Sequence, residues 1–284
     1  MKLLCPNCHA PLRLQNYTCK NNHQFKTEDG VLILLEDEFA EKLNFRLSRF
    51  SKIRKNKLDA YLKPTDYPLL PHGDAVSGNV EWRLRQFDLE ILIPLIKDRK
   101  GQRVLEIGPY NGWLTHRMAE LDLNITAIDY FIDDLDGLKT KKYYREKWKS
   151  IQMDIKDLSI IDESFDIIVV NRCLQFFESP IEYFCSLKQK LTQNGMIILT
   201  GLQFFKNPQQ KRKQLEKIKS DFKREHNFDF MFVPSKGYLD FEDKQKLSSQ
   251  NVDLHPYTKL FITNLRSLIK PSLPRHYFGI YHPQ

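Results

Sequence analysis

A chain of 284 residues has room for one full-sized domain with a small appendage, or for two modest domains. Its 41% hydrophobic residues, with only 11 glycines and 14 prolines, exclude a disordered, collagen-like or low-complexity chain. The net charge of +8 permits affinity for phosphate groups without establishing a nucleic-acid partner. No apolar run reaches the roughly 18 residues of a spanning helix, and no signal peptide is recognisable, so we expect no membrane partner and a cytoplasmic location.

The first predicted element is a small metal-binding ribbon at the N-terminus. Its candidate ligands are Cys5, Cys8, Cys19 and His23, which form one C-x2-C pair and one C-x3-H pair. Each pair can form a knuckle, and three thiolates with one imidazole suit tetrahedral zinc. Because four protein ligands leave no open coordination position, we expect a structural Zn²⁺. The alternative is four unrelated polar residues in a loop-rich terminus.

A long amphipathic helix is predicted after the ribbon, because apolar residues recur at helical spacing over 39–53. A stretch rich in helix breakers follows at 64–78, and we interpret it as a linker or an active-site lid. The predicted domains are therefore a zinc ribbon at 1–36, a helical linker or lid at 37–78 and a cofactor-binding domain at 79–284.

From residue 80 onward, helical segments alternate with short apolar segments, which is the pattern of a parallel sheet with crossover helices. The predicted strands lie at 103–107, 125–128, 150–155, 166–170 and 196–200. The predicted helices include 80–93, which Pro94 interrupts, and the segments 113–121 and 181–191 between the strands. A basic helix, a helix at 240–249, a strand at 252–257, another helix and a last strand at 277–281 complete an α/β fold.

A strand that runs into a glycine-bearing turn and then a helix is the most informative segment. It contains Glu106, Gly108, Tyr110 and Gly112, with the acid two residues before the first glycine. At such a turn the backbone can approach a ligand closely. The segment resembles the acid-x-Gly-x-Gly-x-Gly pattern of class I S-adenosylmethionine-dependent methyltransferases, with Tyr110 at the place of the middle glycine. An ordinary strand-to-helix turn is the alternative.

The resemblance implies a Rossmann-like, mostly parallel sheet whose last strand is antiparallel, and S-adenosylmethionine as cofactor. It implies that Glu106, Gly108, Tyr110 and Gly112 lie in the cofactor site. Asp129 matches the acid that accepts the ribose hydroxyls, since a carboxylate takes two hydrogen bonds at once. Asp154 matches the residue that accepts from the adenine amino group, with Met153 beside the ring. Asn171 opens the loop where family members bind methionine and substrate. A helix cap for Asp129 and a turn residue for Asp154 are the alternatives.

The likeness covers roughly residues 80–284, and the ribbon adds a second one over about 35 residues. The ribbon is similar to those that precede some bacterial methyltransferase domains, and to the zinc module of 23S ribosomal RNA guanine-N1 methyltransferases. Neither resemblance identifies the methyl acceptor.

Methyl transfer requires positioning of the acceptor, and it requires a base only when the nucleophile carries a proton. No candidate base stands out among His72, His116, Tyr110, Gln175 and His276, so the catalytic residue stays unassigned. We favour a small-molecule acceptor over RNA, because the basic run 211–224 contains one aromatic residue, Phe222, where RNA readers interleave several. RNA methylation is the alternative, and a binding protein that kept the fold without catalysis is a third. The oligomeric state is not predicted.

Overall fold

The computed structural model describes residues 2–55 and 62–283, and its contacts divide the chain into unit 1, Met1–Ile168, and unit 2, Val169–Gln284. Part of the predicted linker, residues 56–61, lies outside the described residues. The predicted domain boundaries stay a prediction.

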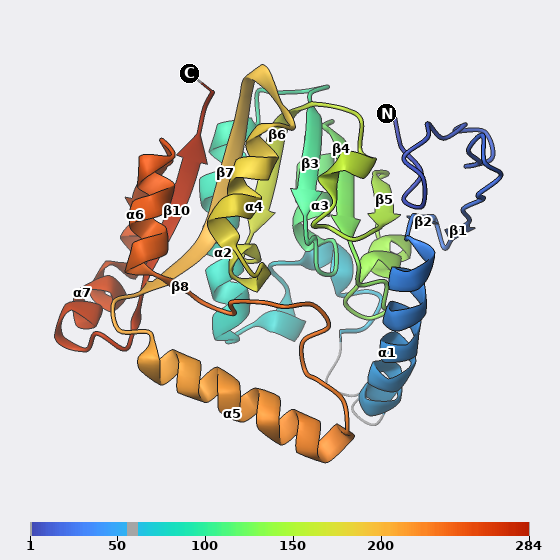
Figure 1. Ribbon diagram of the computed structural model, residues 1–284. Coiled ribbons are helices and arrows are strands. Elements are labelled where there is room, and N and C mark those ends of the chain that lie inside the picture. The colour runs from blue at the N-terminus through green and yellow to red at the C-terminus, as the bar shows by residue number, and fades with distance from the viewer. Residues whose placement is uncertain (1, 56–61, 284) are drawn as a thin grey trace. The chain divides into compact units, whose positions relative to one another are not determined.

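Unit 1 is built on a sheet in the order β1-β2-β5-β4-β3 (Figure 1). Its strands are β1 Thr27–Glu28, β2 Val31–Ile33, β3 Arg103–Ile107, β4 Asn124–Asp129 and β5 Lys149–Gln152. Strands β2, β5, β4 and β3 run parallel to their neighbours, and β1 is antiparallel to β2. The ribbon strand β2 therefore extends the central sheet, because Val31 is aligned with Ser150 of β5.

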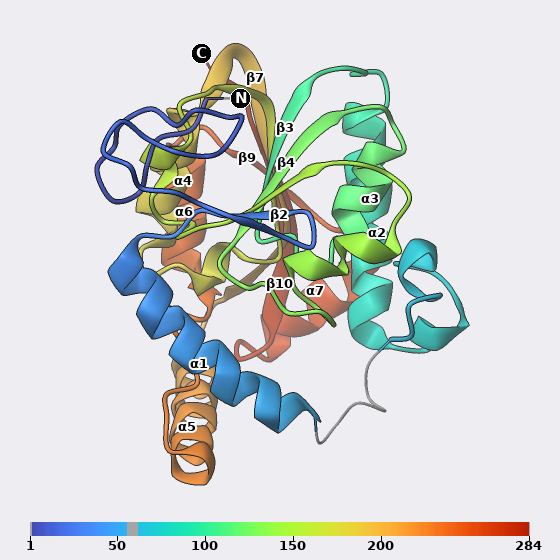
Figure 2. The ribbon, with the colours of Figure 1, turned by 90° about the vertical axis from the view of Figure 1, so that its right-hand side faces the viewer.

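The helices of unit 1 are α1 Asp37–Lys55, α2 Val80–Ile96 and α3 Trp113–Ala119. Helices α2 and α3 lie together on one face of the β3–β4 pair (Figure 2). The interruption predicted at Pro94 is not observed, because α2 contains Pro94 and continues to Ile96. A proline this close to the end removes only one hydrogen bond, and the full burial of Leu92 and Ile96 holds the last turn in place.

The predicted linker or lid at 64–78 contains two 3-10 helices, Tyr67–Leu69 and Asp74–Val76. Tyr67 is fully buried, and its ring stacks on Tyr143 with centroids 4.7 Å apart. The guanidinium of Arg117 donates to the carbonyls of Leu70, at 2.8 Å, and of Pro68, at 3.0 Å. These contacts attach the segment to α3.

Unit 2 contains the end of β6, Phe165–Asn171, which begins in unit 1. Its other strands are β7 Leu191–Phe205, β8 Leu239–Asp240, β9 Asp253–Pro256 and β10 Pro274–Tyr281. Strand β10 is antiparallel to both β7 and β9, whereas β8 is parallel to β7. The predicted strand at 196–200 is the buried centre of the longer β7, which already begins where the helix predicted at 181–191 was expected to end.

The helices of unit 2 are α4 Pro180–Lys188, α5 Gln209–His226, α6 Phe241–Ser249 and α7 Phe261–Ile269. Helices α4 and α6 contact each other and β7, whereas α5 has no buried side chain. The α/β class, the parallel strands and the antiparallel last strand are as predicted. Within the described residues, we find no helix with the length and apolar character needed to cross a membrane.

Candidate cofactor site and metal cluster

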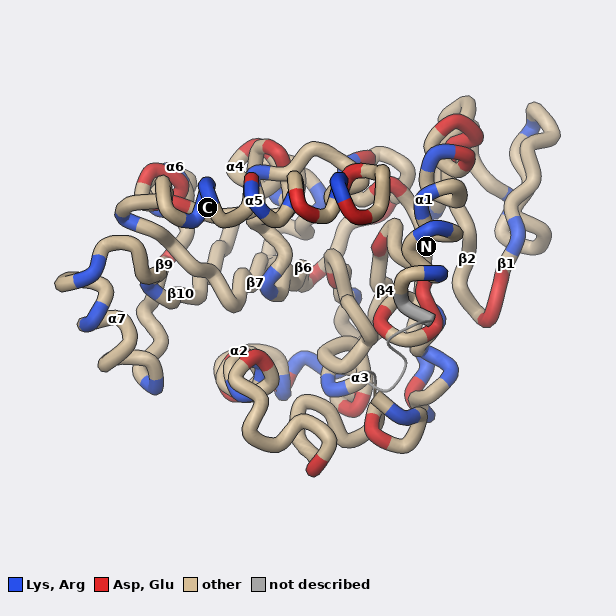
Figure 3. Tube along the Cα trace, turned by 90° about the horizontal axis from the view of Figure 1, so that it is seen from below, with Lys and Arg blue, Asp and Glu red and all other residues tan. Residues whose placement is uncertain are grey.

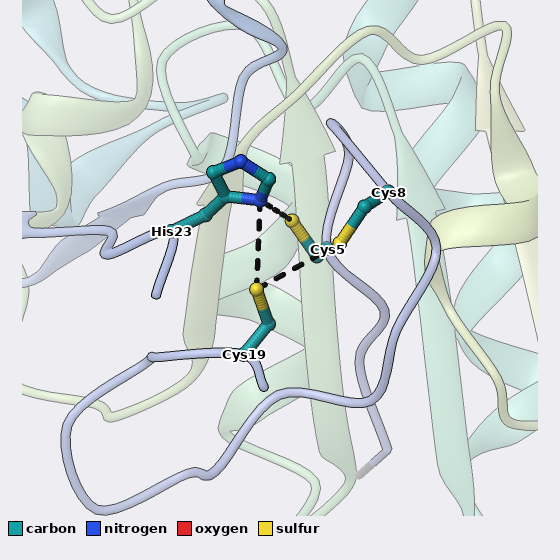
Figure 4. A group of neighbouring side chains, drawn as sticks. All are labelled: Cys5, Cys8, Cys19 and His23. Carbon is teal, nitrogen blue, oxygen red and sulfur yellow. Dashed lines mark hydrogen bonds between the residues drawn. The ribbon is translucent and has the colours of Figure 1, made fainter. Parts of the chain in front are cut away.

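Two knuckles bring the four candidate metal ligands together. In the first, the backbone N–H of His9 donates to the Cys5 carbonyl at 2.7 Å, and in the second the N–H of Asn22 donates to the Cys19 carbonyl at 3.1 Å. His9 and Asn22 both have positive φ, which closes the turns. The Cys5, Cys8 and Cys19 sulfurs and a His23 ring nitrogen all lie within 4.8 Å of one another (Figure 4).

The distances within this cluster fit a tetrahedral zinc ion. Zinc–sulfur bonds of about 2.3 Å at tetrahedral angles separate two sulfurs by about 3.8 Å, and sulfur from nitrogen by about 3.5 Å. The Cys8 and Cys19 sulfurs are 3.7 Å apart, and His23 Nδ1 lies 3.3 Å from the Cys5 sulfur and 3.5 Å from the Cys19 sulfur. The donor set and its spacing are therefore compatible with zinc.

The thiols of the cluster differ in acidity. The backbone N–H of Ala10 lowers the pKa of Cys8 to about 6, whereas burial raises the pKa of Cys5 to about 11. Because a metal binds the thiolate, Cys8 offers its sulfur in the binding form at neutral pH, and Cys5 releases a proton when a metal binds.

The turn between β3 and α3 contains three residues with a left-handed backbone conformation. Gly108, Tyr110 and Gly112 have φ values of 64°, 57° and 76°. A Cβ at Gly112 would lie 3.3 Å from both the Trp148 and the Tyr144 rings. A side chain is therefore disfavoured at Gly112 by conformation and by space.

Tyr110 adopts the backbone conformation that a glycine would adopt at the middle of this turn. A non-glycine residue with this φ is strained by on the order of 1 kcal/mol, so the surrounding structure must hold it. Its side chain is 42% exposed, and the guanidinium of Arg85 lies over its ring, 5.5 Å from the centroid. Tyr110 thus holds a left-handed conformation at the position where the resemblance expects a glycine.

Glu106 lies behind the turn in a buried position. Its side chain is 1% exposed and accepts a 2.5 Å hydrogen bond from the Thr115 hydroxyl of α3. Burial raises the pKa of this carboxyl to about 7. Contact of Glu106 with the cofactor stays a prediction, and in this structure the carboxyl joins β3 to α3.

The buried carboxyl of Glu106 predicts a specific dependence of stability on pH. Because the folded-state pKa is raised, this group's contribution is fully present below about pH 4.5 and is lost as the pH rises to about 7. Glu106→Gln keeps the shape without the charge, so we expect it to raise the free energy of unfolding by about 3 kcal/mol at pH 8 and to change it little at pH 4. Chemical unfolding of both proteins over this pH range measures the difference, and a constant difference would contradict the assignment.

Asn111 is a turn residue that the sequence motif did not single out. Its backbone carbonyl accepts hydrogen bonds from the hydroxyls of Thr140, at 2.9 Å, and Tyr144, at 2.8 Å. Its side-chain oxygen accepts from the Trp113 N–H at 3.3 Å, and its buried Nδ2 has no hydrogen-bond partner among the described residues. Asn111 therefore fixes the turn to the segment that follows β4.

Asp129 ends β4 next to the glycine turn. The register aligns Ile107 of β3 with Ile128, so the turn and Asp129 follow neighbouring parallel strands at the same edge of the sheet. The half-buried carboxylate of Asp129 accepts the Phe131 N–H at 3.1 Å, and burial raises its pKa to about 7. A half-buried carboxyl that accepts backbone hydrogen bonds from Phe131 and Tyr130 thus lies at the edge where the resemblance placed the ribose acceptor.

Met153 and Asp154 follow β5 at this edge. Met153 is fully buried, and its backbone N–H donates to the Asp129 carbonyl at 2.9 Å. Burial raises the pKa of Asp154, whose carboxylate accepts the Lys156 N–H at 3.0 Å. Asp154 lines a cavity whose other walls come partly from the ribbon and α1. These other residues are Pro6, Leu34, Glu36, Phe39, Asp157 and Ile160.

Asn171 belongs to unit 2, where it ends β6. Its side-chain amide donates to the Thr200 hydroxyl of β7 at 2.7 Å. The next residue, Arg172, has a φ of 53°, and a Cβ at Gly201 would lie 2.2 Å from the Arg172 Cγ. The loop that Asn171 opens is therefore held against the bend of β7 at Gly201, and the substrate-side role of Asn171 stays a prediction.

The candidate bases have different surroundings. His116 is 4% exposed, and its Nδ1 lies 2.6 Å from a Glu146 carboxylate oxygen. The Gln175 side chain donates to the Arg172 carbonyl at 2.6 Å. His72 is exposed and lines a cavity between 72–79 and the start of α2. His276 is buried in β10.

The central region of the chain is similar to known proteins. Residues 105–199 match the family described as "Methyltransferase domain". The fold also resembles that of phosphoethanolamine N-methyltransferase 2 from Haemonchus contortus, with a TM-score of 0.51, 14% identity and coverage of 78% of this chain and 56% of that one. The predicted Rossmann-like methyltransferase fold is confirmed.

Two curated relatives are methyl-transfer or related enzymes. Malonyl-[acyl-carrier protein] O-methyltransferase of Bacillus cereus is 25% identical over 137 residues, covering 45% of this chain and 49% of that protein. The tRNA U34 carboxymethyltransferase of Photobacterium profundum is 23% identical over 184 residues, covering 63% of this chain and 56% of that protein. The chain thus spans about half the length of the curated relatives it matches.

Proposed function

We propose that this protein is an S-adenosylmethionine-dependent methyltransferase that acts on a small-molecule acceptor. One edge of the unit 1 sheet carries the proposal. There the turn Gly108–Gly112, the half-buried carboxyl of Asp129 and the buried Met153 follow three neighbouring parallel strands. In open α/β sheets, ligands bind outside the carboxyl ends of the strands. The methyltransferase-domain match supports the proposal.

Each residue of this edge has a proposed role toward the cofactor. The turn at Gly108, Tyr110 and Gly112 lets the backbone approach the methionine part. Asp129 accepts the ribose hydroxyls, and Met153 and Asp154 border the adenine ring. Bound S-adenosylmethionine supplies an electrophilic methyl carbon on a sulfonium. The residues of the chain position the acceptor and exclude water, because this displacement needs no covalent intermediate with the protein.

We propose a structural zinc ion at Cys5, Cys8, Cys19 and His23. All four positions of a tetrahedral ion are filled by these residues, so the ion has no place for substrate or water. The role of the ion is structural, because it would hold the two knuckles together. The backbone N–H of Leu4 donates to the Ile160 carbonyl at 2.8 Å, and this contact joins the ribbon to the segment that follows β5.

Two of the comparisons favour different classes of methyl acceptor. The Bacillus cereus relative acts on a malonyl group carried by a protein, and this favours a small acceptor or a small group on a carrier. The Photobacterium profundum relative acts on tRNA, and the basic helix α5, which has no buried side chain, favours RNA as the second candidate. We rank the small molecule first, because the apolar residues Leu215 and Phe222 of α5 are half-buried and serve packing.

Incubation of the full chain with methyl-labelled S-adenosylmethionine and two fractions of a cell extract tests the ranking. One fraction contains small molecules and carrier proteins, and the other contains purified RNA. We expect label in the first fraction. Label that enters only RNA would reverse the ranking of the acceptors, and label that enters neither would refute the proposed activity.

Charge reversal on α5 separates the two acceptor classes further. Lys213 and Lys219 are exposed, whereas Arg212 donates to the Tyr238 hydroxyl at 2.7 Å and is left unchanged. With a small acceptor, we expect Lys213→Glu/Lys219→Glu to leave turnover within about threefold, because surface substitutions have small effects. An RNA enzyme would lose affinity, and its slope of log affinity against log salt would flatten by roughly 0.7–0.9 for each phosphate contact removed. Filter binding to bulk RNA at several salt concentrations measures that slope.

A further inference from the structure

Helix α7, Phe261–Ile269, exposes an unusual number of large apolar side chains for its length. The exposed fractions are 67% for Phe261, 65% for Ile262, 48% for Leu265, 57% for Leu268 and 87% for Ile269. These positions are spaced i, i+1, i+4, i+7 and i+8, so they share one face of the helix. A contiguous apolar face of this kind marks an interaction site far more often than single exposed apolar residues do.

The opposite, polar face of α7 is the one that packs against the protein. The Asn264 side chain accepts the His276 N–H at 2.7 Å and donates to the His276 carbonyl at 3.1 Å. Ser267 is 1% exposed, and its hydroxyl accepts from Arg275 Nε at 3.0 Å. Strand β10 thus anchors α7 by its polar side chains. An amphipathic helix ordinarily packs the other way round, so this anchoring holds the apolar face outward.

The charge around the apolar face has one sign. Lys259, Arg266 and Lys270 are exposed beside it, and no aspartate or glutamate occurs anywhere in 254–284. Figure 3 shows the blue segments of α7 without a red segment among them. A second copy of the chain would place the same cations against one another, which charge repulsion disfavours. The partner that fits this face has a negatively charged surface and an apolar interior that the face can enter.

We propose that α7 docks on the surface of a lipid bilayer that contains anionic lipids. The five apolar side chains enter the boundary between headgroups and acyl chains, and the flanking cations contact the lipid phosphates. The helix lies in the plane of the surface and does not cross the bilayer. This inference revises the expectation of no membrane partner, which rested on the absence of a spanning segment.

Vesicle sedimentation with the full chain tests the proposal. Vesicles of phosphatidylglycerol and phosphatidylcholine in equal parts are compared with vesicles of phosphatidylcholine alone. We expect the partition coefficient to be higher on the anionic vesicles and to fall with added salt. Ile262→Gln/Ile269→Gln is expected to lower it at least tenfold, roughly the effect of removing one or two buried aliphatic side chains.

A matched control removes exposed apolar side chains elsewhere. Val80→Gln/Ile218→Gln changes residues that are 69% and 47% exposed, and we expect the partition coefficient to stay within about twofold. The proposal would be overturned if both double variants lowered the partition coefficient equally, or if the α7 variant still bound the anionic vesicles. It would also be overturned if the chain self-associated reversibly and Ile262→Gln/Ile269→Gln abolished this association, because the face would then bind a second copy. The absence of binding to anionic vesicles at low salt would also overturn it and leave an acidic protein as the occupant.

Discussion

Cys8→Ser is expected to release the zinc ion and to unfold the ribbon. Zinc binding in such modules contributes on the order of 10 kcal/mol to folding, which is more than a ribbon of about 35 residues supplies without metal. The variant removes the Cys8 sulfur, which lies 3.7 Å from the Cys19 sulfur, and leaves three of the four zinc ligands. Elemental analysis should give about one zinc per wild-type chain and markedly less in the variant.

Amide hydrogen exchange of Cys8→Ser measures how far the unfolding extends beyond the ribbon. We expect loss of protection at ribbon amides such as Leu4 and partial loss at Leu34, whose N–H donates to Gln152 of β5 at 2.8 Å. Amides of β3 and β4 should keep their protection, because these strands pair with each other independently of the ribbon. Cys185→Ser, a cysteine of α4 in unit 2, is the matched control and should retain the metal. Zinc-free wild-type protein, freshly prepared without chelator, would refute the metal assignment.

Asp129→Ala is expected to weaken binding of S-adenosylmethionine and of its demethylated product by roughly 10- to 100-fold. The variant removes a charged acceptor from the ribose hydroxyls, and a hydrogen bond to a charged group contributes about 1.5–3 kcal/mol. Equilibrium binding of labelled cofactor measures the change. Asp122→Ala is the control, because that carboxylate is 67% exposed, pairs with Lys100 and precedes β4 at its other end.

The pKa of Asp129 adds a dependence on pH to the same measurement. The pKa is raised to about 7, so the carboxyl is protonated in acid and ionised above neutrality. Because the ionised form is the better acceptor, cofactor affinity should rise by roughly tenfold from pH 6 to pH 8. Asp129→Asn should remove this rise. An unchanged affinity in Asp129→Ala, or a rise that survives in Asp129→Asn, would show that another group holds the ribose.

The sequence predicted the elements whose signals are local. The strand 103–107 is observed with its predicted bounds, because a short apolar run between a basic start and a glycine has few alternatives. The sequence signal for the metal cluster was also local, since both knuckles are short and their ligands are close along the chain. The glycine turn was predicted despite Tyr110, and the structure shows that this tyrosine takes the left-handed conformation.

Features that depend on tertiary contacts were not predictable. The pairing of β2 with β5 joins residues more than a hundred positions apart, and no local pattern specifies it. The cavity that Phe39 and Leu34 form beside Asp154 was not predictable for the same reason, because these residues are also more than a hundred positions from Asp154. The outward apolar face of α7 was hidden as well, because hydrophobic periodicity gives the face of a helix without showing which side packs.

Titration calorimetry of the zinc-loaded full chain with S-adenosylhomocysteine tests the central claim most directly, because this product is chemically stable and contains the ribose and adenine that the sheet edge is proposed to bind. The account predicts one site per chain with a micromolar Kd that weakens at least about tenfold in Asp129→Ala. The absence of both heat and thermal stabilisation at millimolar concentrations of the nucleoside would contradict it, and would favour a protein that kept the fold without the cofactor.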